Sequence, residues 1–462
     1  MNQPEKGGKK LLNAWAFYDW ANSVYTLTIA SSIFPIFYSA LFAGAVEKNV
    51  EAFGMVFKST ALITYVTAFT FLVVTFSSPI LSGIADYVGN KKNFMKFFCY
   101  MGGAGCIGLY WFSLDRIYLS LLFYFMGLLG YWGSLVFYNS YLPDIAYPEQ
   151  QDAISAKGFS MGYVGSVLLL ILNLVMVMYP EFFGFDISIS DNLRSNGSEA
   201  EISEALQNAK DNASIKAMRY AFITVGVWWV LFSQYTFYVL PKGTSKGKKV
   251  TKDVLFNGVK ELKQVWNQLQ NNFRLKRYLI AFFVFSMAVQ TIMLVAVYFG
   301  EEEINWGGAE AKTTGLIGSI LIIQLVAILG AFLTSRASSK FGNIKTLIFI
   351  NGIWMALCVY AYFMETAMQF YIAASIVGFV MGGIQSLARS TYSKFLPATD
   401  DTTSYFSFYD VAEKIGIVIG MIIFATIDQI TGSMRNAILF LFVFFLVGIV
   451  LLFRVPKSGI KN

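Results

Sequence analysis

A series of apolar runs constrains the fold of this chain more than any other feature, because many reach the roughly 20 residues that a helix needs to cross a bilayer. Hydrophobic residues make up 56% of its 462 residues, which is more apolar surface than a soluble core could hide. The runs predict an all-α membrane protein with twelve transmembrane helices. These are expected near 15–42, 60–85, 95–113, 117–140, 154–179, 217–240, 276–299, 313–335, 345–364, 368–390, 405–427 and 434–454.

The distribution of charge predicts the orientation of these helices. The stretch 241–275 between the sixth and seventh spans is basic, and the net charge of the chain is +7. If both termini are cytoplasmic, roughly 25 Lys and Arg residues lie in cytoplasmic segments and about 9 lie outside, as the positive-inside rule expects. We therefore expect both termini in the cytoplasm. The positive charge indicates contact with anionic membrane lipid, and no nucleic acid partner is expected.

One expected outside loop, residues 180–216, is long enough to have structure of its own. Ser198 and Glu201 have the spacing of a capping box, in which a serine and a glutamate three residues later each bind a backbone N–H of the other. This pattern predicts a short surface helix that ends near Asp211.

An internal repeat divides the chain into two similar parts. YVGNKK (87–92) follows the second span and FGNIK (341–345) follows the eighth, while YLP (141–143) and FLP (395–397) follow the fourth and tenth. The two matches have nearly the same offset, so the repeat predicts two pseudo-symmetric six-helix bundles, 1–240 and 276–462, joined by the basic central loop 241–275. Two such bundles that face each other across a cavity are typical of transporters that alternate access.

The residue types present argue against an enzyme. The chain contains no histidine, which removes the commonest general base and metal ligand. Its three cysteines lack metal-ligand spacing, and no span carries paired acidic metal ligands. We therefore expect no catalytic activity, no metal and no cofactor. A membrane receptor or scaffold that transports nothing is an alternative to a transporter.

The stretch LSGIADYVGNKK (81–92) resembles the signature between the second and third helices of the major facilitator superfamily. The matching residues are Asp86, Gly89, Lys91 and Lys92. Ser82 stands where that signature usually has glycine, and Asn90 where it usually has arginine. The resemblance implies a major facilitator fold and a cytoplasmic gate loop that helps to hold the two halves together.

Further motifs are similar to those of the vacuolar-efflux, autophagy-related branch of this superfamily and its bacterial relatives. They include WAFYDWANSVY (15–25), FPIFY (34–38), LPDIA (142–146) and SAKGFSMGYVG (155–165). The resemblance implies a secondary active transporter that exports amino acids, here in a bacterial cytoplasmic membrane. Export of drugs or sugars is the alternative, although the glycine-proline signature of many drug exporters is absent from the fifth span.

The first span begins with a polar stripe. Trp15, Asp19, Asn22 and Thr26 recur on one face of a helix, with Ser23 beside them. An Asp facing lipid near the bilayer centre would cost roughly 2.5–3.5 kcal/mol on insertion scales, so a cavity-lining position is one interpretation. The alternative is a carboxylate at the level of the lipid headgroups, with the tryptophans as interfacial belt residues.

A second charged cluster occurs in the eleventh span, FSFYDVAEKIG (406–416). Asp410 and Lys414 are four residues apart and can form an ion pair along one helix, which leaves Glu413 without a partner. The topology brings Asp19, Arg389 and this cluster to a similar depth. We hypothesise a polar vestibule in which Asp19 pairs with Lys414 or Arg389 in one state of the transport cycle and is released in the other.

The expected site suits a small, nearly neutral solute. A multiply anionic solute would require several cations in the spans, and few are present. Asp19 and Glu413 are candidates to carry a coupling proton, and Na⁺ is an alternative coupling ion. The protein is expected to be a monomer. The candidate residues are Asp19, Asn22, Ser23, Thr26, Tyr138, Asn139, Gln290, Gln385, Arg389, Tyr409, Glu413 and Lys414.

Overall fold

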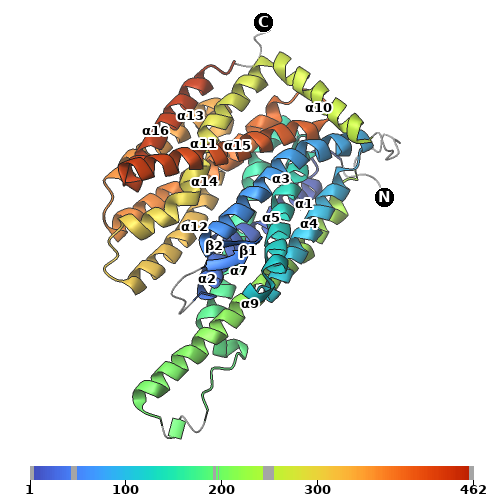
Figure 1. The fold of residues 1–462 in the computed structure, drawn as a ribbon. Coiled ribbons are helices and arrows are strands. Elements are labelled where there is room, and N and C mark those ends of the chain that lie inside the picture. The colour runs from blue at the N-terminus through green and yellow to red at the C-terminus, as the bar shows by residue number, and fades with distance from the viewer. Residues whose placement is uncertain (1–4, 43–48, 191–193, 196, 243–253, 457–462) are drawn as a thin grey trace.

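The fold is a bundle of long helices with a narrow projection at one end (Figure 1). The structure is a computed structural model that describes residues 5–42, 49–190, 194–195, 197–242 and 254–456. The first half contains α1 (Lys9–Val24), α2 (Phe34–Ala40), α3 (Ser59–Val88), α4 (Lys91–Gly108), α5 (Ile117–Ser140), the short α6 (Leu142–Ile145), α7 (Pro148–Met178) and α9 (Glu199–Val239). The second half contains α11 (Phe273–Glu303), α12 (Ala309–Phe341), α13 (Asn343–Tyr362), α14 (Ala367–Phe395), α15 (Thr402–Thr431) and α16 (Met434–Phe453).

Each of the twelve expected spans coincides with a helix or a continuous helical path. Within the described residues, ten paths are long and apolar enough to cross a membrane by themselves. The helices α4 and α15 lie outside that set, and α4 carries three lysines among its 18 residues. The prediction of an all-α membrane protein is therefore confirmed, and the order of the helices follows the predicted order.

The first span contains an irregular helical segment. A π-helix, Tyr25–Ile33, connects α1 to α2, and all three parts form one path from Lys9 to Ala40. In a π-helix the backbone hydrogen bonds run from residue i to i+5, which is rare and often occurs at functional sites. The sequence did not predict this change of helix type.

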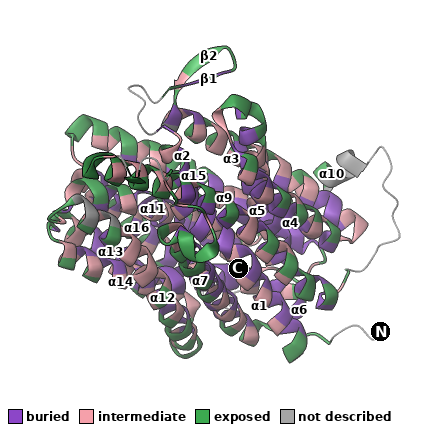
Figure 2. Ribbon diagram, turned by 90° about the horizontal axis from the view of Figure 1, so that it is seen from below, coloured by how far each residue is buried: buried purple, intermediate pink, exposed green. Residues whose placement is uncertain are grey.

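The two halves pack around separate hydrophobic clusters. One cluster is formed by residues between Leu11 and Leu240, and the other by Tyr163 together with residues between Val265 and Val455. Buried residues lie in the interior of the bundle, and exposed residues lie on the outward sides of the helices (Figure 2). This arrangement agrees with the predicted pair of six-helix bundles.

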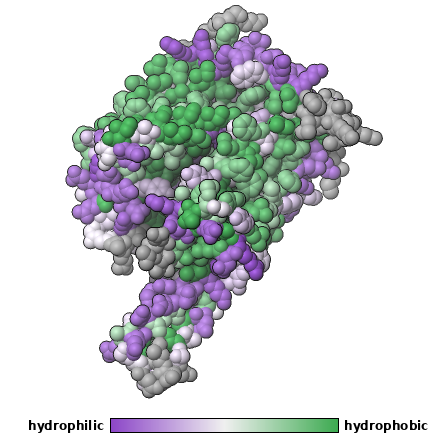
Figure 3. All heavy atoms as spheres, viewed as in Figure 1, coloured by the Kyte–Doolittle hydropathy of each residue, from purple (hydrophilic) through white to green (hydrophobic). Residues whose placement is uncertain are grey.

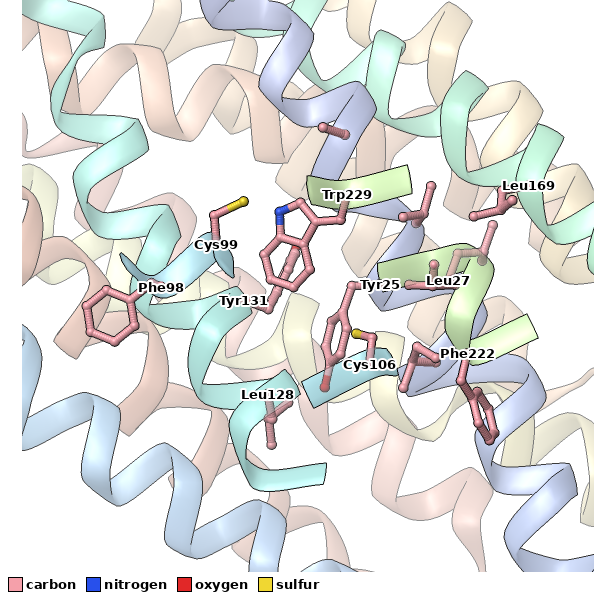
Figure 4. Packing of buried hydrophobic residues seen from close by; sticks show 14 of the residues in the cluster. Tyr25, Leu27, Phe98, Cys99, Cys106, Leu128, Tyr131, Leu169, Phe222 and Trp229 are labelled. Atoms are coloured by element: carbon pink, nitrogen blue, oxygen red, sulfur yellow. The ribbon is translucent and has the colours of Figure 1, made fainter. Parts of the chain in front are cut away.

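In the interior of the first half, aromatic side chains pack together with leucine and cysteine side chains (Figure 4). The rings of Tyr25 and Tyr131 stack with centroids 5.2 Å apart, and Trp229 lies 5.9 Å from Tyr25. Helices α4 and α5 approach closely where Gly102 faces Gly130, since a Cβ added to Gly102 would lie 3.2 Å from the Cα of Gly130. Small residues allow such close packing where helices cannot gain from a hydrophobic effect between them.

The basic central stretch contains a helix that the sequence did not reveal. This helix, α10 (Val254–Asn271), packs against α3 and α15, and the hydroxyl of Tyr405 donates a hydrogen bond of 2.9 Å to Gln268. Residues 243–253 lie outside the described part of the chain. We use "α10 end" for the end of the bundle that carries α10, and "α9 end" for the opposite end.

The projection at the α9 end corrects one prediction. Ser198 and Glu201 form the expected capping box, with the Ser198 N–H donating to Glu201 at 2.8 Å and the Glu201 N–H donating to the Ser198 hydroxyl at 3.3 Å. However, the helix does not end near Asp211; α9 continues without a break to Val239. Residues 201–216 contain no Gly or Pro, so nothing interrupts the helix. Hydrophilic side chains cover much of this projection (Figure 3).

A β-hairpin at the α9 end was also not predicted. Strands β1 (Asn49–Ala52) and β2 (Met55–Lys58) are antiparallel, with Asn49 opposite Lys58. Phe53 and Gly54 form the turn, and both have positive φ, 53° and 72°. A two-residue turn with positive φ at both positions matches the right-handed twist of a hairpin.

The internal repeat has a structural counterpart at the α10 end. Gly89 ends α3 with a φ of 72°, and Gly342 lies between α12 and α13 with a φ of 88°. Glycine adopts positive φ without steric cost, so it fits both positions, although the ψ angles of 34° at Gly89 and 150° at Gly342 give the two turns different shapes. The two turns are in equivalent positions of the two halves.

Candidate functional site

A cavity lies between the two halves of the molecule. The cavity has a volume of about 130 Å³, which is below the range of about 300–1,000 Å³ typical of small-molecule sites. Its lining comes from six helices, three in each half. The lining residues are Asp19, Ser23, Tyr131, Trp132, Leu135, Asn139, Phe159, Phe282, Phe285, Ser286, Val289, Gln290, Ile384, Gln385, Ala388, Arg389, Tyr409 and Glu413.

Asp19 pairs with Arg389 at the wall of this cavity. Two nitrogens of Arg389, Nη2 and Nη1, lie 3.3 Å and 3.4 Å from Oδ2 of Asp19, and the hydroxyl of Tyr138 donates to the same oxygen at 2.8 Å. Asp19 is 4% exposed and Trp15 is fully buried, so the headgroup-level interpretation of this stripe is wrong. The pair connects α1 of the first half to α14 of the second.

Arg389 also binds two further helices of the first half. Its Nε donates to the Ser155 hydroxyl and its Nη2 to the Ser155 carbonyl, each at 3.0 Å, while Nη1 donates to Oδ1 of Asn139 at 3.2 Å. A guanidinium has several donors in a rigid planar group, so one side chain can bind α1, α5 and α7 together. A lysine could not make the same set of contacts.

Aromatic rings enclose the guanidinium. Its central carbon lies 4.2 Å from the ring centroid of Phe159 and 4.8 Å from that of Trp15. Cations are attracted to ring faces at these distances. The enclosure depends on Gly158, because a Cβ there would lie 3.2 Å from Nη2 of Arg389 and would collide with the Asp19 carboxylate.

Lys414 belongs to a second charged cluster. Its Nζ lies 2.7 Å from Oδ1 of Asp410, so the expected pair along one helix is present. It also lies 3.1 Å from Oε2 of Glu413 and 3.7 Å from the ring centroid of Trp132 in the first half. Of the two partners considered for Asp19, the structure therefore contains Arg389 and not Lys414.

The prediction that Glu413 has no partner is wrong. The amide of Gln290 donates to Oε1 of Glu413 at 2.8 Å, and Lys414 binds the other oxygen. Gln290 lies on α11, more than a hundred residues earlier in the chain. The spacing of residues along one helix could not reveal this contact, because it depends on how two helices pack.

The other candidates divide into two groups. Ser23 and Asn139 line the cavity, as do Gln385 and Tyr409. The side-chain amide oxygen of Gln385 accepts a hydrogen bond of 2.9 Å from the Tyr163 hydroxyl, and the Tyr409 ring stacks on Phe282 with centroids 4.1 Å apart.

Asn22 and Thr26 do not belong to the lining of this cavity. Asn22 is 1% exposed, and the Thr26 hydroxyl donates to the Ser23 carbonyl at 2.9 Å within its own helix. Both lie on the predicted stripe, but Asn22 is buried against the protein and Thr26 is half-buried.

Three site residues on α7 were missed. Ser155 and Phe159 contact Arg389, and Tyr163 contacts Gln385. They recur every four residues and so lie on one face of the helix. That spacing was visible within SAKGFSMGYVG, but none of the three is charged, and an uncharged stripe in an apolar span does not stand out.

Of the three charged residues of the predicted gate loop, all but one contact the second half at the α10 end. Asp86 accepts backbone N–H bonds from Thr403 at 3.3 Å and Ser404 at 2.6 Å, in the first turn of α15, where a carboxylate is stabilised by the helix dipole. Lys91 binds Asp144 in its own half and the Thr402 hydroxyl of the other half at 3.1 Å.

The exception is Lys92. It donates to the carbonyl of Leu240 at 2.5 Å, so this contact lies within the first half and does not bridge the two halves.

A second set of contacts between the two halves, equivalent to those of Asp86 and Lys91, was not predicted. Oδ2 of Asp152, near the start of α7, accepts from Lys394 at 2.6 Å and from Ser338 at 2.8 Å, and Oδ1 accepts from Asn343 at 2.9 Å. Asn343 follows Gly342, the counterpart of Gly89 in the repeat. The internal repeat could have predicted these contacts, because a gate loop in one half implies an equivalent loop in the other half.

Comparison with known sequences identifies the family. The family model described as "Vacuole effluxer Atg22 like" matches residues 7–190 and 201–461. The MFS-type transporter YxiO of Bacillus subtilis is 29% identical over 96% of this chain and 95% of its own length. Autophagy-related protein 22 of Eremothecium gossypii is 20% identical over 93% of this chain and 87% of its own.

Solved structures have the same fold. The proton:xylose symporter XylE matches with a TM-score of 0.70 at 12% identity over 97% of this chain and 96% of its own. The Escherichia coli fucose:proton symporter FucP matches with a TM-score of 0.67 at 16% identity over 97% and 98%. The chain is therefore a secondary transporter of the major facilitator superfamily, not an enzyme, and it belongs to the Atg22-like vacuole effluxer family.

Proposed function

We propose that this transporter exports a small polar solute, with amino acids as the substrate class, in exchange for protons. The observation that carries the proposal is the Arg389 side chain, which closes the cavity by binding α1, α5 and α7 of the opposite half. A transporter that alternates access needs a contact that holds its halves together in one state and breaks in the other. This side chain is suited to that role because its contacts all cross between the halves.

The end of the molecule at which the two halves touch indicates which state of the transport cycle is described. Asp86, Asp152 and Arg389 all contact the opposite half toward the α10 end. We infer that the α10 end faces the cytoplasm, as the positive-inside pattern predicts. The described state is then the one in which the cytoplasmic entrance is shut, and uptake of solute from the cytoplasm requires these contacts to open.

The charges of the cavity support a zwitterionic or neutral solute. Its lining carries two carboxylates, Asp19 and Glu413, and one guanidinium, Arg389. A multiply anionic solute would meet more negative than positive charge there. The family description as vacuole effluxers supports export of small metabolites. Amino acids carry one charge of each sign and fit such a lining.

A carboxylate that loses its cationic partner can bind a proton. When Arg389 withdraws, Asp19 would lose the cation that stabilises its charged form, which favours the protonated acid. The solved symporters FucP and XylE are described as moving protons with their sugars. We propose that protonation of Asp19 accompanies opening at the α10 end. We also propose that the protein acts as a monomer in a bacterial cytoplasmic membrane. The bacterial relative YxiO supports this location.

A transport assay in proteoliposomes tests the function. Purified protein is reconstituted, and counterflow of labelled alanine is challenged with amino acids, short peptides, sugars and cationic drugs, with and without a pH gradient. We expect amino acids to compete and an imposed pH gradient to drive their movement. Saturable transport of a sugar or a drug with no response to any amino acid would overturn the substrate class. Insensitivity to the gradient and to a protonophore would overturn proton coupling.

A further inference from the structure

The buried charges around the cavity do not balance. Among the residues that the structure describes, three carboxylates, Asp19, Asp410 and Glu413, face two cations, Arg389 and Lys414, so one negative charge is left unmatched. An unmatched charge in a poorly solvated interior is costly, so it tends to acquire a counter-ion or a proton. This set of contacts is therefore incomplete as it stands.

Two observations locate the missing charge at the second cluster. Asp19 receives two guanidinium nitrogens and the Tyr138 hydroxyl. By contrast, Lys414 is the single cation in the described part of the chain that pairs with Asp410 and Glu413. Oδ2 of Asp410 is buried and has no hydrogen-bond partner among the described residues. The second cluster therefore has one positive charge, on Lys414, for two carboxylates.

Glu413 is the carboxylate of this cluster that a solute can reach. It lines the cavity, and 18% of its side chain is exposed, compared with 8% for Asp410. The other ionisable groups around it are Tyr409, Asp410 and Lys414 on its own helix, and Tyr131 on α5. Asp19 and Arg389, which are paired with each other, line the same cavity. Gln290 holds one oxygen of Glu413 from α11 without supplying charge.

We propose that Glu413 is an ammonium-binding site, at which the amino group of the solute and a proton compete for the same carboxylate. The proposal rests on the proposed function and makes it more specific. One positive charge completes the cluster, as either a bound proton or a solute ammonium. The proton leaves the carboxyl of Glu413 for water as the ammonium binds, so each amine that enters the site displaces one proton.

The site then recognises an amine more strictly than a carboxylate. The guanidinium of Arg389 already donates to Asp19, Asn139 and Ser155, and Lys414 is almost fully buried against its partners. In this state neither cation is free to bind a solute carboxylate. The ring of Trp132, which contacts Lys414, and the neighbouring Tyr131 also line the cavity and can contact the apolar part of an amine.

Two probes separate the amine from the carboxylate. L-Alaninamide has an ammonium and no carboxylate, whereas N-acetyl-L-alanine has a carboxylate and no ammonium. Their affinities are measured from the shift in unfolding temperature of the full-length protein in detergent, because a ligand that binds only the native state stabilises it. Titrations at pH 5, 6 and 7 keep the amine charged, since α-amino groups titrate near pH 7.7–8.0.

We expect alaninamide to bind the wild-type protein, with an affinity that rises by up to about tenfold per pH unit, the slope for displacement of one proton. N-Acetyl-L-alanine should bind at least about tenfold more weakly, which corresponds to roughly 1.4 kcal/mol. Glu413→Gln should lose alaninamide binding and its pH dependence. The control Glu301→Gln, a half-exposed carboxylate on α11 outside the cavity, should keep both.

The wild-type measurement decides the proposal even if Glu413→Gln does not fold. Equal binding of the two probes, or alaninamide binding that does not change between pH 5 and 7, would overturn it. Failure of the proposed function has a different signature, because alaninamide would then bind with the expected pH slope while no amino acid moves in proteoliposomes. Conversely, amino-acid transport that N-acetyl-L-alanine inhibits as well as alaninamide does would leave the function intact and reject the ammonium site.

Discussion

Nη2 of Arg389 lies 3.3 Å from Oδ2 of Asp19, although 370 residues separate the two in the chain. Both side chains are almost fully buried, and each comes from a different half of the molecule. Their pairing therefore depends on the relative position of the halves, which is the quantity that changes when a transporter alternates access.

Asp19→Asn should reduce transport by at least about tenfold while the protein stays folded. The substitution keeps the shape of the side chain but leaves the charge of Arg389 buried without a carboxylate, which costs about 3–5 kcal/mol in the closed state. Opening at the α10 end lets Arg389 reach water, so the equilibrium should shift toward that open state. Counterflow gives the transport rate, and size-exclusion chromatography checks the fold. Transport at the wild-type rate would contradict a role for this pair.

Arg389→Lys should reduce transport nearly as much as removal of the charge. Lysine keeps the positive charge but has a single nitrogen, which cannot bind Asp19, Asn139 and Ser155 together. Transport and unfolding temperature are compared with those of Arg389→Gln. If the lysine variant kept most of the activity, charge alone would suffice and the contacts with α5 and α7 would be dispensable.

Gly158→Ala should impair transport although alanine is the better helix former. An added methyl group at this position would collide with the Asp19 carboxylate and press on Nη2 of Arg389. Gly352→Ala is the matched control, because a Cβ there meets nothing within 4 Å. The control should keep full transport and gain up to about 1 kcal/mol of stability from its helix propensity. Equal activity of the two variants would show that the pair tolerates displacement.

Asp152→Asn should loosen the α10 end without affecting the cavity directly. Its carboxylate accepts from Lys394, Ser338 and Asn343, and the loss of charge-assisted bonds of this kind costs about 1.5–3 kcal/mol each. We expect amide hydrogen exchange at the starts of α7 and α13 to become at least about fivefold faster. Asp115→Asn, an exposed carboxylate elsewhere in the first half, should leave exchange there unchanged.

Ser198→Ala should affect the projection at the α9 end and nothing else. The serine hydroxyl caps the first turn of α9, and loss of such a cap costs about 1 kcal/mol of local helix stability. Hydrogen exchange should become about fivefold faster in the first turn, Glu199–Ile202, while transport stays at the wild-type rate. A large loss of transport would assign the projection a part in solute movement.

Much of the fold was predictable because hydropathy is a local property. A run of about 20 apolar residues becomes a membrane-spanning helix almost regardless of its neighbours, since the backbone must satisfy its hydrogen bonds within the segment. Apart from the π-helix Tyr25–Ile33 in the first span, the failures lie outside the predicted spans, where water can satisfy the backbone and no such constraint applies. There the hairpin at Phe53 and Gly54 was missed, and α9 was ended too early.

The candidate site was only partly predictable for a different reason. The charges of Asp19, Arg389 and Glu413 stood out because charged side chains are rare within spans. Ser155 and Phe159 did not stand out, since neither is unusual in an apolar helix. Their role depends on contact with a side chain from the opposite half, which no local pattern encodes.

The sequence by itself determined the order of the membrane-spanning helices, the duplication into two halves and the presence of charge within the spans. The orientation in the membrane, which rests on the distribution of Lys and Arg in the sequence, stays a prediction. Only the tertiary structure decided that Asp19 pairs with Arg389 and not with Lys414, that Gln290 holds Glu413, and that one negative charge remains unmatched. Hydropathy acts within single segments, whereas charge pairing depends on distances of about 3–4 Å between helices that lie far apart in the chain.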